Sequence, residues 1–545
     1  MARRRDRRMH ANTSARSRSG AQPSGGAGGS EPMGAAAFSY APLQNGSDVR
    51  GVAIAGVPGE EVNLDRAAAA VVVKAFAVWL AERLGKAEVR VALGRDSRLS
   101  GCALAAAAAA GASSSGAAVT DVGLATTPAM FMCCVTEGYD FDGGVMLTAS
   151  HLPFNRNGMK FFTKTGGLGK DDISAILRIA EGLRARGELP AAEQYALAPH
   201  EDFMPAYAAQ LRALIVEGVG AGDKPLDGMS VVVDAGNGAG GFFAHDVLAP
   251  LGADVSDSQF LEPDGSFPNH VPNPEDAEAM GSCATAVLKA NADLGVVLDT
   301  DCDRSGLVLS DGRFLNRNRL IAALCASVLR DSPGASIVTD SVTSAGLADF
   351  IEGRGGVHVR FQRGYKNVIN KGVELNEQGV DCPLMIETSG HGAMRENYYL
   401  DDGAYLAVKL IIEAARAKRA GSSEGLASLL DGLREPLEEK EARLKILKDD
   451  FGPYGDGVLD KFVTWCQSST APAGWTSEAV NHEGWRVVVD EGSGRQGWAL
   501  LRKSLHDPLL VCNIESDTEG GVEAIAAKLR AFLGQFSGGL DLSKL

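Results

Sequence analysis

Three carboxylates occupy alternate positions in the stretch Asp299-Thr-Asp301-Cys-Asp303, directly after an apolar run typical of a buried strand. Two carboxylates about 4 Å apart repel each other by about 4 kcal/mol near a protein surface. Three in alternate positions therefore indicate a bound cation, and ligation by oxygen alone suits Mg²⁺. An EF-hand is excluded, because its sixth position requires Gly and its twelfth Glu, where this chain has Arg304 and Ser310. A solvated acidic turn is the alternative.

A second candidate for chemistry is Ser150, in the sequence Thr-Ala-Ser-His after the apolar residues Val145 to Leu147. This pattern predicts a short strand with Ser150 and His151 at its carboxyl end, where α/β sheets build their sites. A serine hydroxyl is a poor nucleophile unless a base or metal activates it, and His151 and Lys160 are near enough in sequence to be candidates. A loop whose hydroxyls satisfy backbone groups is the alternative.

Two further polar stretches follow apolar ones. Glu387 and Ser389 come after Pro383-Leu-Met-Ile and are two positions apart, so on a strand end they point the same way and can hold neighbouring hydroxyls of a sugar. A capped strand end is the alternative. Near the C-terminus, Arg502 offers a planar fork suited to phosphate oxygens, and Ser504 adds a hydroxyl donor.

The elements that must position these residues alternate between strands and helices. The pattern predicts a helix over 66–84, a strand over 89–93 that leads into the loop Gly94-Arg-Asp-Ser-Arg98, and a further helix over 202–215. Such alternation is typical of α/β domains, and the last hundred residues resemble a smaller α+β unit.

One glycine-rich stretch offers a competing interpretation. Gly236, Gly238 and Gly241 satisfy G-x-G-x-x-G after an expected strand, with acidic residues about 20 positions on. A dinucleotide-binding domain normally begins with this motif, whereas here the motif follows a complete-looking domain. We therefore favour close packing between strand and helix as the reason for the glycines, with NAD binding as the alternative.

Length and composition limit the function classes. With 545 residues, the chain is long enough for three or four domains. Its net charge of −16 argues against a general nucleic-acid-binding protein. No stretch approaches the roughly 20 apolar residues that a membrane span requires. Nine cysteines without a C-x-x-C pair suggest neither a disulfide framework nor a zinc site.

The N-terminal segment differs from the rest of the chain. Residues 1–30 contain seven arginines, one acidic residue and many Ser, Gly and Ala. This composition predicts a disordered extension over residues 1–42, and it is also typical of organelle transit peptides. We expect import into a plastid, with an untargeted tail on a cytoplasmic protein as the alternative.

Taken in order, the motifs resemble those of the α-D-phosphohexomutases, over about residues 43–535. Thr148 to His151 resembles their phosphoserine loop, Asp299 to Arg304 their metal loop and Glu387 to His391 their sugar-contacting loop. Trp498 to Pro508 resembles their phosphate-binding loop. The chain departs from the family in the metal loop, where Thr300 and Cys302 replace glycines, and in the phosphate loop, where His506 replaces Thr and Asp507 replaces Glu. The Ser-Gly-His sequence at 389–391 places the chain nearer the bacterial-type phosphoglucomutase/phosphomannomutase branch.

The resemblance implies an α/β fold of four domains around a central cleft. Three are α/β domains with mixed sheets, over residues 43–201, 202–312 and 313–438, and the fourth is a smaller α+β domain over 439–545. The implied reaction interconverts hexose 1-phosphates and hexose 6-phosphates through a phosphoserine and a hexose 1,6-bisphosphate. The glucose phosphates are the favoured substrates. A phosphomannomutase, a phosphoglucosamine mutase and a non-catalytic sugar-phosphate sensor remain alternatives. An aspartyl-phosphate phosphatase built on Asp299 is another, but it leaves Ser150 and Glu387 unexplained.

The resemblance also implies roles for individual residues. The phosphate is carried by Ser150, one Mg²⁺ is bound by Ser150, Asp299, Asp301 and Asp303, and Arg50 and Arg304 lie beside the phosphate. The base is Lys160 or His151. Sugar and second phosphate are contacted by Gly364, Lys366, Glu387, Ser389, His391, Arg502 and Ser504. The expected partners are small sugar phosphates, with hexose 1,6-bisphosphate as activator, and the protein is a monomer or homodimer.

Overall fold

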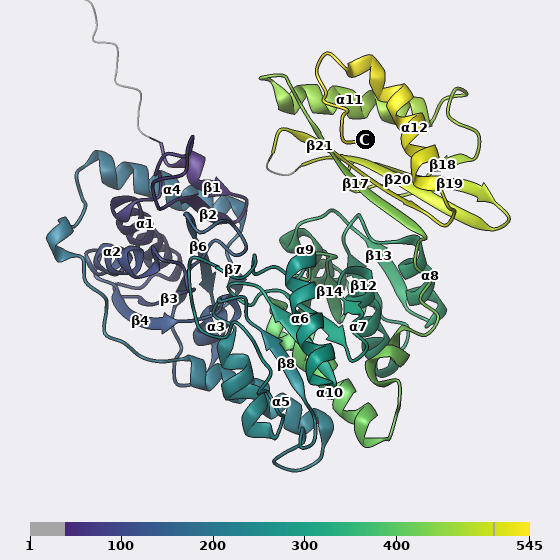
Figure 1. Ribbon diagram of the computed structural model, residues 1–545. Coiled ribbons are helices and arrows are strands. Elements are labelled where there is room, and N and C mark those ends of the chain that lie inside the picture. The colour runs from purple at the N-terminus through teal and green to yellow at the C-terminus, as the bar shows by residue number, and fades with distance from the viewer. Residues whose placement is uncertain (1–38, 505–506) are drawn as a thin grey trace, which may run out of the picture. The chain divides into compact units, whose positions relative to one another are not determined.

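The protein, here a computed structural model that describes residues 39–504 and 507–545, contains four β-sheets that follow one another along the chain (Figure 1). Of the segment 1–42, for which we predicted disorder and a transit function, residues 1–38 lie outside the described residues. Tyr40 is buried, and Ala41–Leu43 form a short 3₁₀-helix. Within the described part, no helix is long and apolar enough to cross a bilayer.

The first sheet is mixed, with strand order β1-β2-β6-β5-β3-β4 and β7 beside β6. β3 runs parallel to β4 and β5, and the other neighbours are antiparallel. The strands are β1 (Gln44–Asn45), β2 (Asp48–Val52), β3 (Arg90–Arg95), β4 (Ala118–Leu124), β5 (Gly143–Leu147), β6 (Arg156–Thr163) and β7 (Gly166–Gly167). The helices are α1 (Arg66–Leu84), α2 (Gly101–Ser113), α3 (Thr127–Val135) and α4 (Lys170–Ala185).

Helix α1 has the bounds predicted from the sequence, and its ends explain why. The Asp65 side chain accepts a hydrogen bond from the Ala68 amide at its start, and Gly85 ends it with a φ of 63°. The helix is apolar on nearly every side, because α2 and α4 both pack against it.

The second sheet has the order β11-β10-β9-β8, with β8 parallel to β9 and the remaining neighbours antiparallel. Its strands are β8 (Val231–Asp234), β9 (Leu294–Leu298), β10 (Ser305–Leu309) and β11 (Phe314–Leu315), and its helices are α5 (Met204–Val219) and α6 (Ala277–Ala290). Because β11 pairs with β10, this sheet continues beyond residue 312, where we expected the domain to end.

The third sheet has the order β13-β12-β14-β15-β16 and is again mixed. Its strands are β12 (Ser336–Thr339), β13 (Val357–Arg360), β14 (Leu384–Ile386), β15 (Gly392–Met394) and β16 (Leu400–Asp401). Its helices are α7 (Arg317–Asp331), α8 (Ala345–Gly353), α9 (Tyr365–Glu377) and α10 (Gly403–Arg419).

The fourth sheet is antiparallel throughout, with the order β17-β21-β20-β19-β18. Its strands are β17 (Glu438–Lys445), β18 (Trp475–Ser477), β19 (Trp485–Gly492), β20 (Arg495–Lys503) and β21 (Leu509–Ser516), and α11 (Phe451–Cys466) and α12 (Gly521–Leu533) pack on it. The fold prediction, three α/β units with mixed sheets and a smaller α+β unit, is confirmed.

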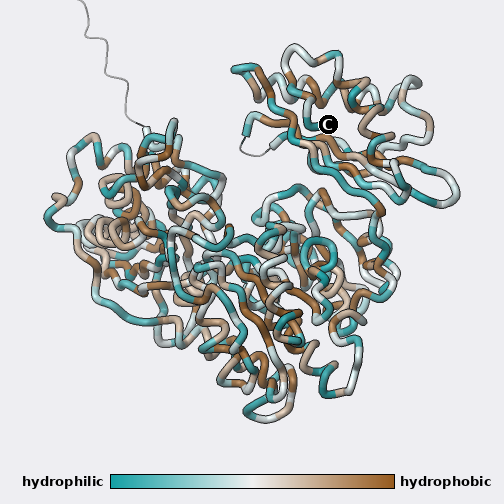
Figure 2. Tube along the Cα trace, viewed as in Figure 1, coloured by the Kyte–Doolittle hydropathy of each residue, from teal (hydrophilic) through white to brown (hydrophobic). Residues whose placement is uncertain are grey.

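Apolar residues run along the strands of all four sheets (Figure 2). One continuous core cluster joins buried side chains from Ala92 to Leu426 and so spans the first three sheets. The fourth sheet has its own cluster, from Ala442 to Leu545. The first three units therefore share a core, whereas the fourth unit has its own main cluster. It meets the third unit through a small cluster of Val342, Trp498 and Leu500.

Candidate active site

The acidic loop is the turn of the hairpin between β9 and β10. The side chains of Asp299, Asp301 and Asp303 are at most 1% exposed, and their ligand atoms lie within 4.8 Å of one another. Within the described part of the chain, Asp301 Oδ1 and Asp303 Oδ1 are buried and accept no hydrogen bond. Buried carboxylate oxygens without donors are costly unless a cation binds them. This all-oxygen donor set fits a hard divalent cation such as Mg²⁺.

Ser150 lies in the turn between β5 and β6 and faces this loop. Its Oγ donates to Asp299 Oδ2 at 3.0 Å and accepts from Arg304 Nη2 at 3.0 Å. Its φ of 50° is unusual for a residue other than glycine, and Thr148 supports the turn by accepting from the Ser150 amide. The serine hydroxyl thus lies between a carboxylate and a guanidinium of the acidic loop.

Arg98 holds the Ser150 turn in place, a role that the sequence reasoning missed. Its guanidinium donates to the carbonyls of Ser150 and Leu152 through Nη2 and to those of Pro153, at 2.8 Å, and Arg156, at 3.0 Å, through Nη1. Arg98 Nε is 3.2 Å from Asp96 Oδ2, and both side chains are fully buried. Burial raises the pKa of Asp96 to about 6, against the opposing charge of Arg98. The Gly-Arg-Asp-Ser-Arg loop was the available signal, but clustered arginines on loops are usually solvated.

The two candidate bases, Lys160 and His151, differ in charge state: Lys160 is a cation, whereas His151 is neutral. Lys160 Nζ lies 3.1 Å from Asp301 Oδ2 and also contacts Asp303. Burial opposes its charge, but the two carboxylates outweigh burial and raise the pKa of Lys160 well above its ordinary value. For His151, partial desolvation and the charge of Arg304 lower the pKa, so its ring is neutral, with Nδ1 3.3 Å from Ser150 Oγ. In this arrangement Lys160 is a cation, which disfavours it as the base.

Arg50, expected beside the phosphoserine, lies on β2 and pairs with Asp48 at 2.8 Å. Burial opposes its charge, whereas Asp48, Asp301 and Asp303 raise its pKa. Its Nε is buried and, among the described residues, has no hydrogen-bond partner. Arg50 therefore adds a fixed positive charge next to the acidic loop.

The expected sugar-contacting residues meet at the end of β14 and the start of α9. Ser389 Oγ donates to Glu387 Oε2 at 3.1 Å, and the Gly364 amide donates to Glu387 Oε1 at 2.5 Å. Burial raises the pKa of Glu387 to about 7. Lys366 instead donates to the Gly167 carbonyl of β7 at 2.5 Å, and burial lowers its pKa to about 8. Lys366 thus connects the third unit to the first.

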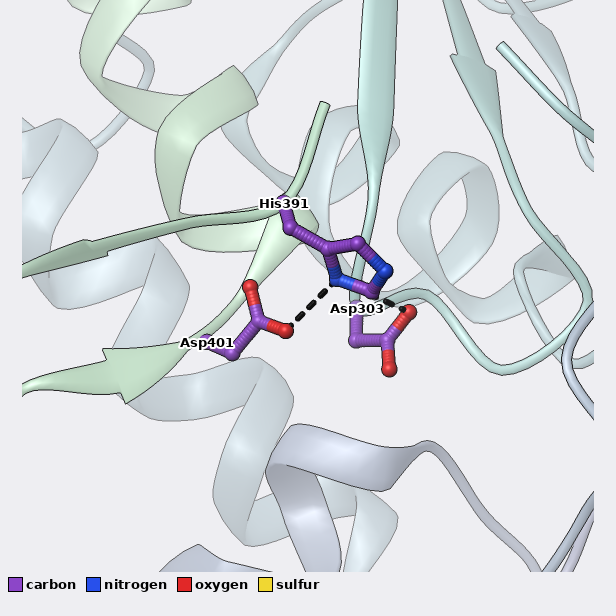
Figure 3. A group of neighbouring side chains, drawn as sticks. All are labelled: Asp303, His391 and Asp401. Carbon is purple, nitrogen blue, oxygen red and sulfur yellow. Dashed lines mark hydrogen bonds and ion pairs between the residues drawn. The ribbon is translucent and has the colours of Figure 1, made fainter. Parts of the chain in front are cut away.

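His391 connects this sugar loop to the acidic loop. Its Nδ1 lies 2.6 Å from Asp401 Oδ2 and 3.8 Å from Asp303 Oδ1 (Figure 3). Its ring stacks on Tyr365, with the centroids 5.0 Å apart. Burial opposes protonation, but Asp401 and Asp303 raise the pKa of His391 to about 9. His391 is therefore a proton donor that reaches both loops.

The expected phosphate-binding residues lie in the fourth unit. Arg502 is at the end of β20, with Nη1 3.5 Å from Glu483 Oε1. Ser504 Oγ accepts from the Asp507 amide at 3.2 Å. His506, which replaces a Thr of the resembled motif, lies outside the described residues.

Comparison with known proteins gives the family. Models of the phosphoglucomutase/phosphomannomutase alpha/beta/alpha domains I, II and III match residues 42–186, 206–312 and 316–432. The phosphomannomutase/phosphoglucomutase of Pseudomonas aeruginosa PAO1 is 31% identical over 497 residues, which cover 90% of this chain and 96% of that protein. The chain belongs to the phosphoglucomutase/phosphomannomutase family.

Other members of the family support the same relationship. The phosphoglucomutase of Neisseria gonorrhoeae is 29% identical over 484 residues, 88% of this chain and 95% of its own. The crystal structure of a phosphoglucomutase/phosphomannomutase family protein from Burkholderia thailandensis aligns with a TM-score of 0.70 and 26% identity. That alignment covers 90% of this chain and 96% of the other.

The glycine-rich stretch 236–241 has a structural role in this member of the family. A Cβ on Gly238 would lie 2.7 Å from the Thr300 Cα and carbonyl oxygen, and the Ala239 amide donates to that oxygen at 2.8 Å. A Cβ on Gly241 would meet the Leu261 carbonyl oxygen at 2.4 Å. We expected packing between strand and helix, but Gly238 instead allows close approach of the acidic loop itself.

The acidic loop also departs from the family pattern at Cys302. This residue has a φ of 61° and a fully buried side chain, so the chain keeps a left-handed conformation where the resembled motif has glycine. The acidic ligand positions remain together despite this substitution.

Proposed function

We propose that the protein interconverts hexose 1-phosphates and hexose 6-phosphates, with glucose as the first candidate, through a phosphate carried by Ser150. The observation that supports this proposal is the position of Ser150 Oγ, 3.0 Å from both Asp299 Oδ2 and Arg304 Nη2. A hydroxyl between a potential metal ligand and a guanidinium is suited to carrying and releasing a phosphate, because charge neutralisation and positioning dominate phosphoryl transfer.

In the proposed transfer, a sugar hydroxyl oxygen bonds to the phosphorus of phosphorylated Ser150 as the bond to Oγ breaks. The Oγ keeps the electron pair, and Arg304 Nη2 stabilises the charge that develops there. A base accepts the proton lost by the sugar hydroxyl. When Ser150 Oγ takes back the second phosphate, that proton is returned to the sugar oxygen released from phosphorus. Of our two candidate bases, Lys160 is held as a cation by the acidic loop, whereas His151 is neutral. His151 Nδ1 already accepts from Arg304 Nη2 at 2.7 Å, so this nitrogen can take the proton only after Arg304 turns to the phosphate.

Asp299, Asp301 and Asp303 would hold Mg²⁺ together with the phosphorylated Ser150, and this cation would neutralise phosphate charge. Glu387 and Ser389 would hold sugar hydroxyls, and Arg502 and Ser504 the phosphate that does not react. His391, protonated near neutral pH, would donate a hydrogen bond to the sugar or to its transferring oxygen. A hexose 1,6-bisphosphate would be both intermediate and activator.

The substrate preference within this class is also a proposal. Glucose and mannose differ only at C2, and the relatives bear both the name phosphoglucomutase and the name phosphomannomutase/phosphoglucomutase. Glucose 1-phosphate is our first candidate, with mannose and glucosamine phosphates as alternatives. A coupled assay of the purified protein on each 1-phosphate, with bisphosphate activator and Mg²⁺, measures this preference directly.

The Ser150→Ala variant tests the role of the serine. We expect it to lose nearly all turnover and to lack the single phosphate that intact-mass analysis should detect on the active protein. Ser114→Ala, on an exposed residue at the end of α2, is the matched control and should retain activity. Unchanged turnover of Ser150→Ala, or a stable phosphate on Asp299, would contradict the proposal.

We further propose plastid import directed by the basic, acid-poor residues 1–30, with cytoplasmic location as the alternative. The three relatives described above are bacterial proteins, so they provide no support for the plastid. Fusion of residues 1–45 to a fluorescent reporter tests the proposal. A diffuse cytosolic signal without cleavage would reject it.

A further inference from the structure

The carboxylate of Glu483 lies among donors that suit a phosphate. Its Oε2 accepts from the Ser341 hydroxyl at 2.6 Å and from the Arg363 amide at 3.0 Å. Its Oε1 lies 3.5 Å from Arg502 Nη1. A hydroxyl, a backbone amide and a guanidinium from three separate segments thus converge on one anionic group, and such groups are the usual donors to phosphate oxygens.

The position of these donors relates them to the proposed substrate. Ser341 lies two residues beyond β12, and Arg363 directly precedes Gly364, whose amide binds Glu387. Arg502 and Ser504 are the residues we propose for the non-reacting phosphate. A pocket of about 470 Å³ adjoins them, and its lining includes Gln362, Glu483, Lys503 and Ser504. Glu483 therefore lies where the third and fourth units present groups for sugar and phosphate.

The contacts of Glu483 leave polar atoms unsatisfied. Its side chain and that of Arg502 are each 7% exposed. Yet Glu483 Oε1 and Arg502 Nε are buried and, within residues 39–504 and 507–545, make no hydrogen bond. Leaving charged groups buried without hydrogen bonds is costly, and a carboxylate has only two oxygens. A phosphate has one more terminal oxygen and a higher charge, so it can satisfy more donors than Glu483 does.

We propose that Glu483 is an internal competitor for the non-reacting phosphate of the sugar, which binds by displacing the Glu483 carboxylate from Ser341, Arg363 and Arg502. This inference rests on the proposed function, because it takes Arg502 as a phosphate-binding residue. Glu483 is then a specificity-determining residue. Dianionic phosphates displace it, whereas singly charged carboxylates, which match it in charge and oxygen number, do not.

The variant Glu483→Gln removes the competing charge and keeps an oxygen that can accept hydrogen bonds. Titration calorimetry with inorganic phosphate should give a dissociation constant roughly five- to tenfold lower than that of the unchanged protein, the range for removing one loose ion pair from a binding site. In the mutase assay the KM for glucose 1-phosphate should fall by a similar factor. The kcat should not rise, because the sugar-phosphate product is bound by the same site and also dissociates more slowly.

Glu478→Gln is the matched control. Glu478 also lies on the fourth unit and pairs with Arg360 of the third unit at 3.1 Å and with Arg486 at 3.0 Å, but it does not contact Arg502 in the described structure. The Glu478→Gln substitution removes an equal charge from the same interface. The affinity of this variant for phosphate should stay within about twofold of that of the unchanged protein. An equal gain in both variants would mean a general electrostatic effect and would overturn the proposal.

Two further variants complete the test. Adding Arg502→Ala to Glu483→Gln should abolish the gain, and a retained gain would place the phosphate elsewhere and refute the inference. If Glu483→Gln does not fold, Glu483→Asp retracts the carboxylate by one methylene and should show a smaller gain in the same direction. Unchanged or weaker phosphate binding by a folded variant overturns the proposal. If Glu483→Gln gains phosphate affinity but the unchanged protein shows no mutase activity, the proposed function is refuted, whereas the inference about this phosphate site is supported.

Discussion

At the scale of single residues, the site depends on buried groups that hold the Ser150 turn and the acidic loop. Arg98 and His391 are the clearest cases. Each is charged and contacts carboxylates or carbonyls from a different part of the chain, and Arg98 is fully buried whereas the His391 side chain is 16% exposed. Their contributions to stability and to activity are separable by substitution.

We expect Arg98→Lys to lower kcat by roughly 10²-fold, because a lysine keeps the charge but cannot bind four carbonyls of the Ser150 turn in fixed geometry. The free energy of unfolding should fall by about 3 kcal/mol, since Asp96 keeps only an imperfect partner. Steady-state kinetics and urea unfolding measure the two effects. Arg178→Lys, on the exposed face of α4, should change neither, and wild-type turnover in Arg98→Lys would refute the assignment.

His391 predicts a pH dependence of stability. Its pKa is raised from about 6.5 to about 9, so its contribution is fully present below pH 6.5 and is lost as the pH rises towards 9. In excess chelator, the free energy of unfolding should fall over that range by at most roughly 3 kcal/mol. Urea unfolding at several pH values measures this fall. Asp401→Asn should reduce it, and a flat profile would contradict the assignment.

At the scale of elements, the acidic loop depends on the stretch that packs behind it. Gly238→Ala would place a Cβ 2.7 Å from the Thr300 backbone, so the loop or the glycine-rich stretch must move. We expect Mg²⁺-dependent turnover to fall at least tenfold and the free energy of unfolding to fall by roughly 1–3 kcal/mol. Assay and thermal unfolding measure these effects.

Gly281→Ala is the control for this prediction. Gly281 lies in the middle of α6, and its added Cβ would meet nothing within 4 Å. This substitution should raise the free energy of unfolding by roughly 0.5–1 kcal/mol and leave turnover unchanged. Equal effects of the two substitutions would mean that Gly238 has no special relation to the loop.

At the scale of the whole molecule, the separate core of the fourth unit predicts unfolding in more than one step. Four of the five tryptophans, Trp465, Trp475, Trp485 and Trp498, belong to that unit. Their fluorescence should therefore change at a different urea concentration from the far-UV circular dichroism, to which all four units contribute. Trp79→Phe should leave the fluorescence midpoint unchanged. Coincident transitions would show that the four units unfold together.

Local sequence patterns were enough to predict several elements and the kinds of residue that form the site. Helix α1, strand β5 and strand β14 lie where hydrophobic periodicity predicted them, because burial of apolar faces and local capping act over a few residues. The metal-binding role of the acidic-loop carboxylates could also be predicted locally, but for an electrostatic reason. Three charges so close in sequence repel each other whatever the fold, and this repulsion indicates a cation.

Which of these groups meet, and in which charge state, became evident from the folded chain alone. Ser150 and Asp299 are 149 positions apart, and Lys160 is 141 positions from Asp301, so no local pattern could predict their contact. The roles of Arg98 and Gly238 depend on backbone carbonyls and other backbone atoms, which any sequence supplies. The proposed role of Glu483 depends on Ser341, Arg363 and Arg502, which are distant from it or from one another in sequence. The neutral His151 and the cationic Lys160 likewise follow from burial and neighbouring charges, which exist only once the chain has folded.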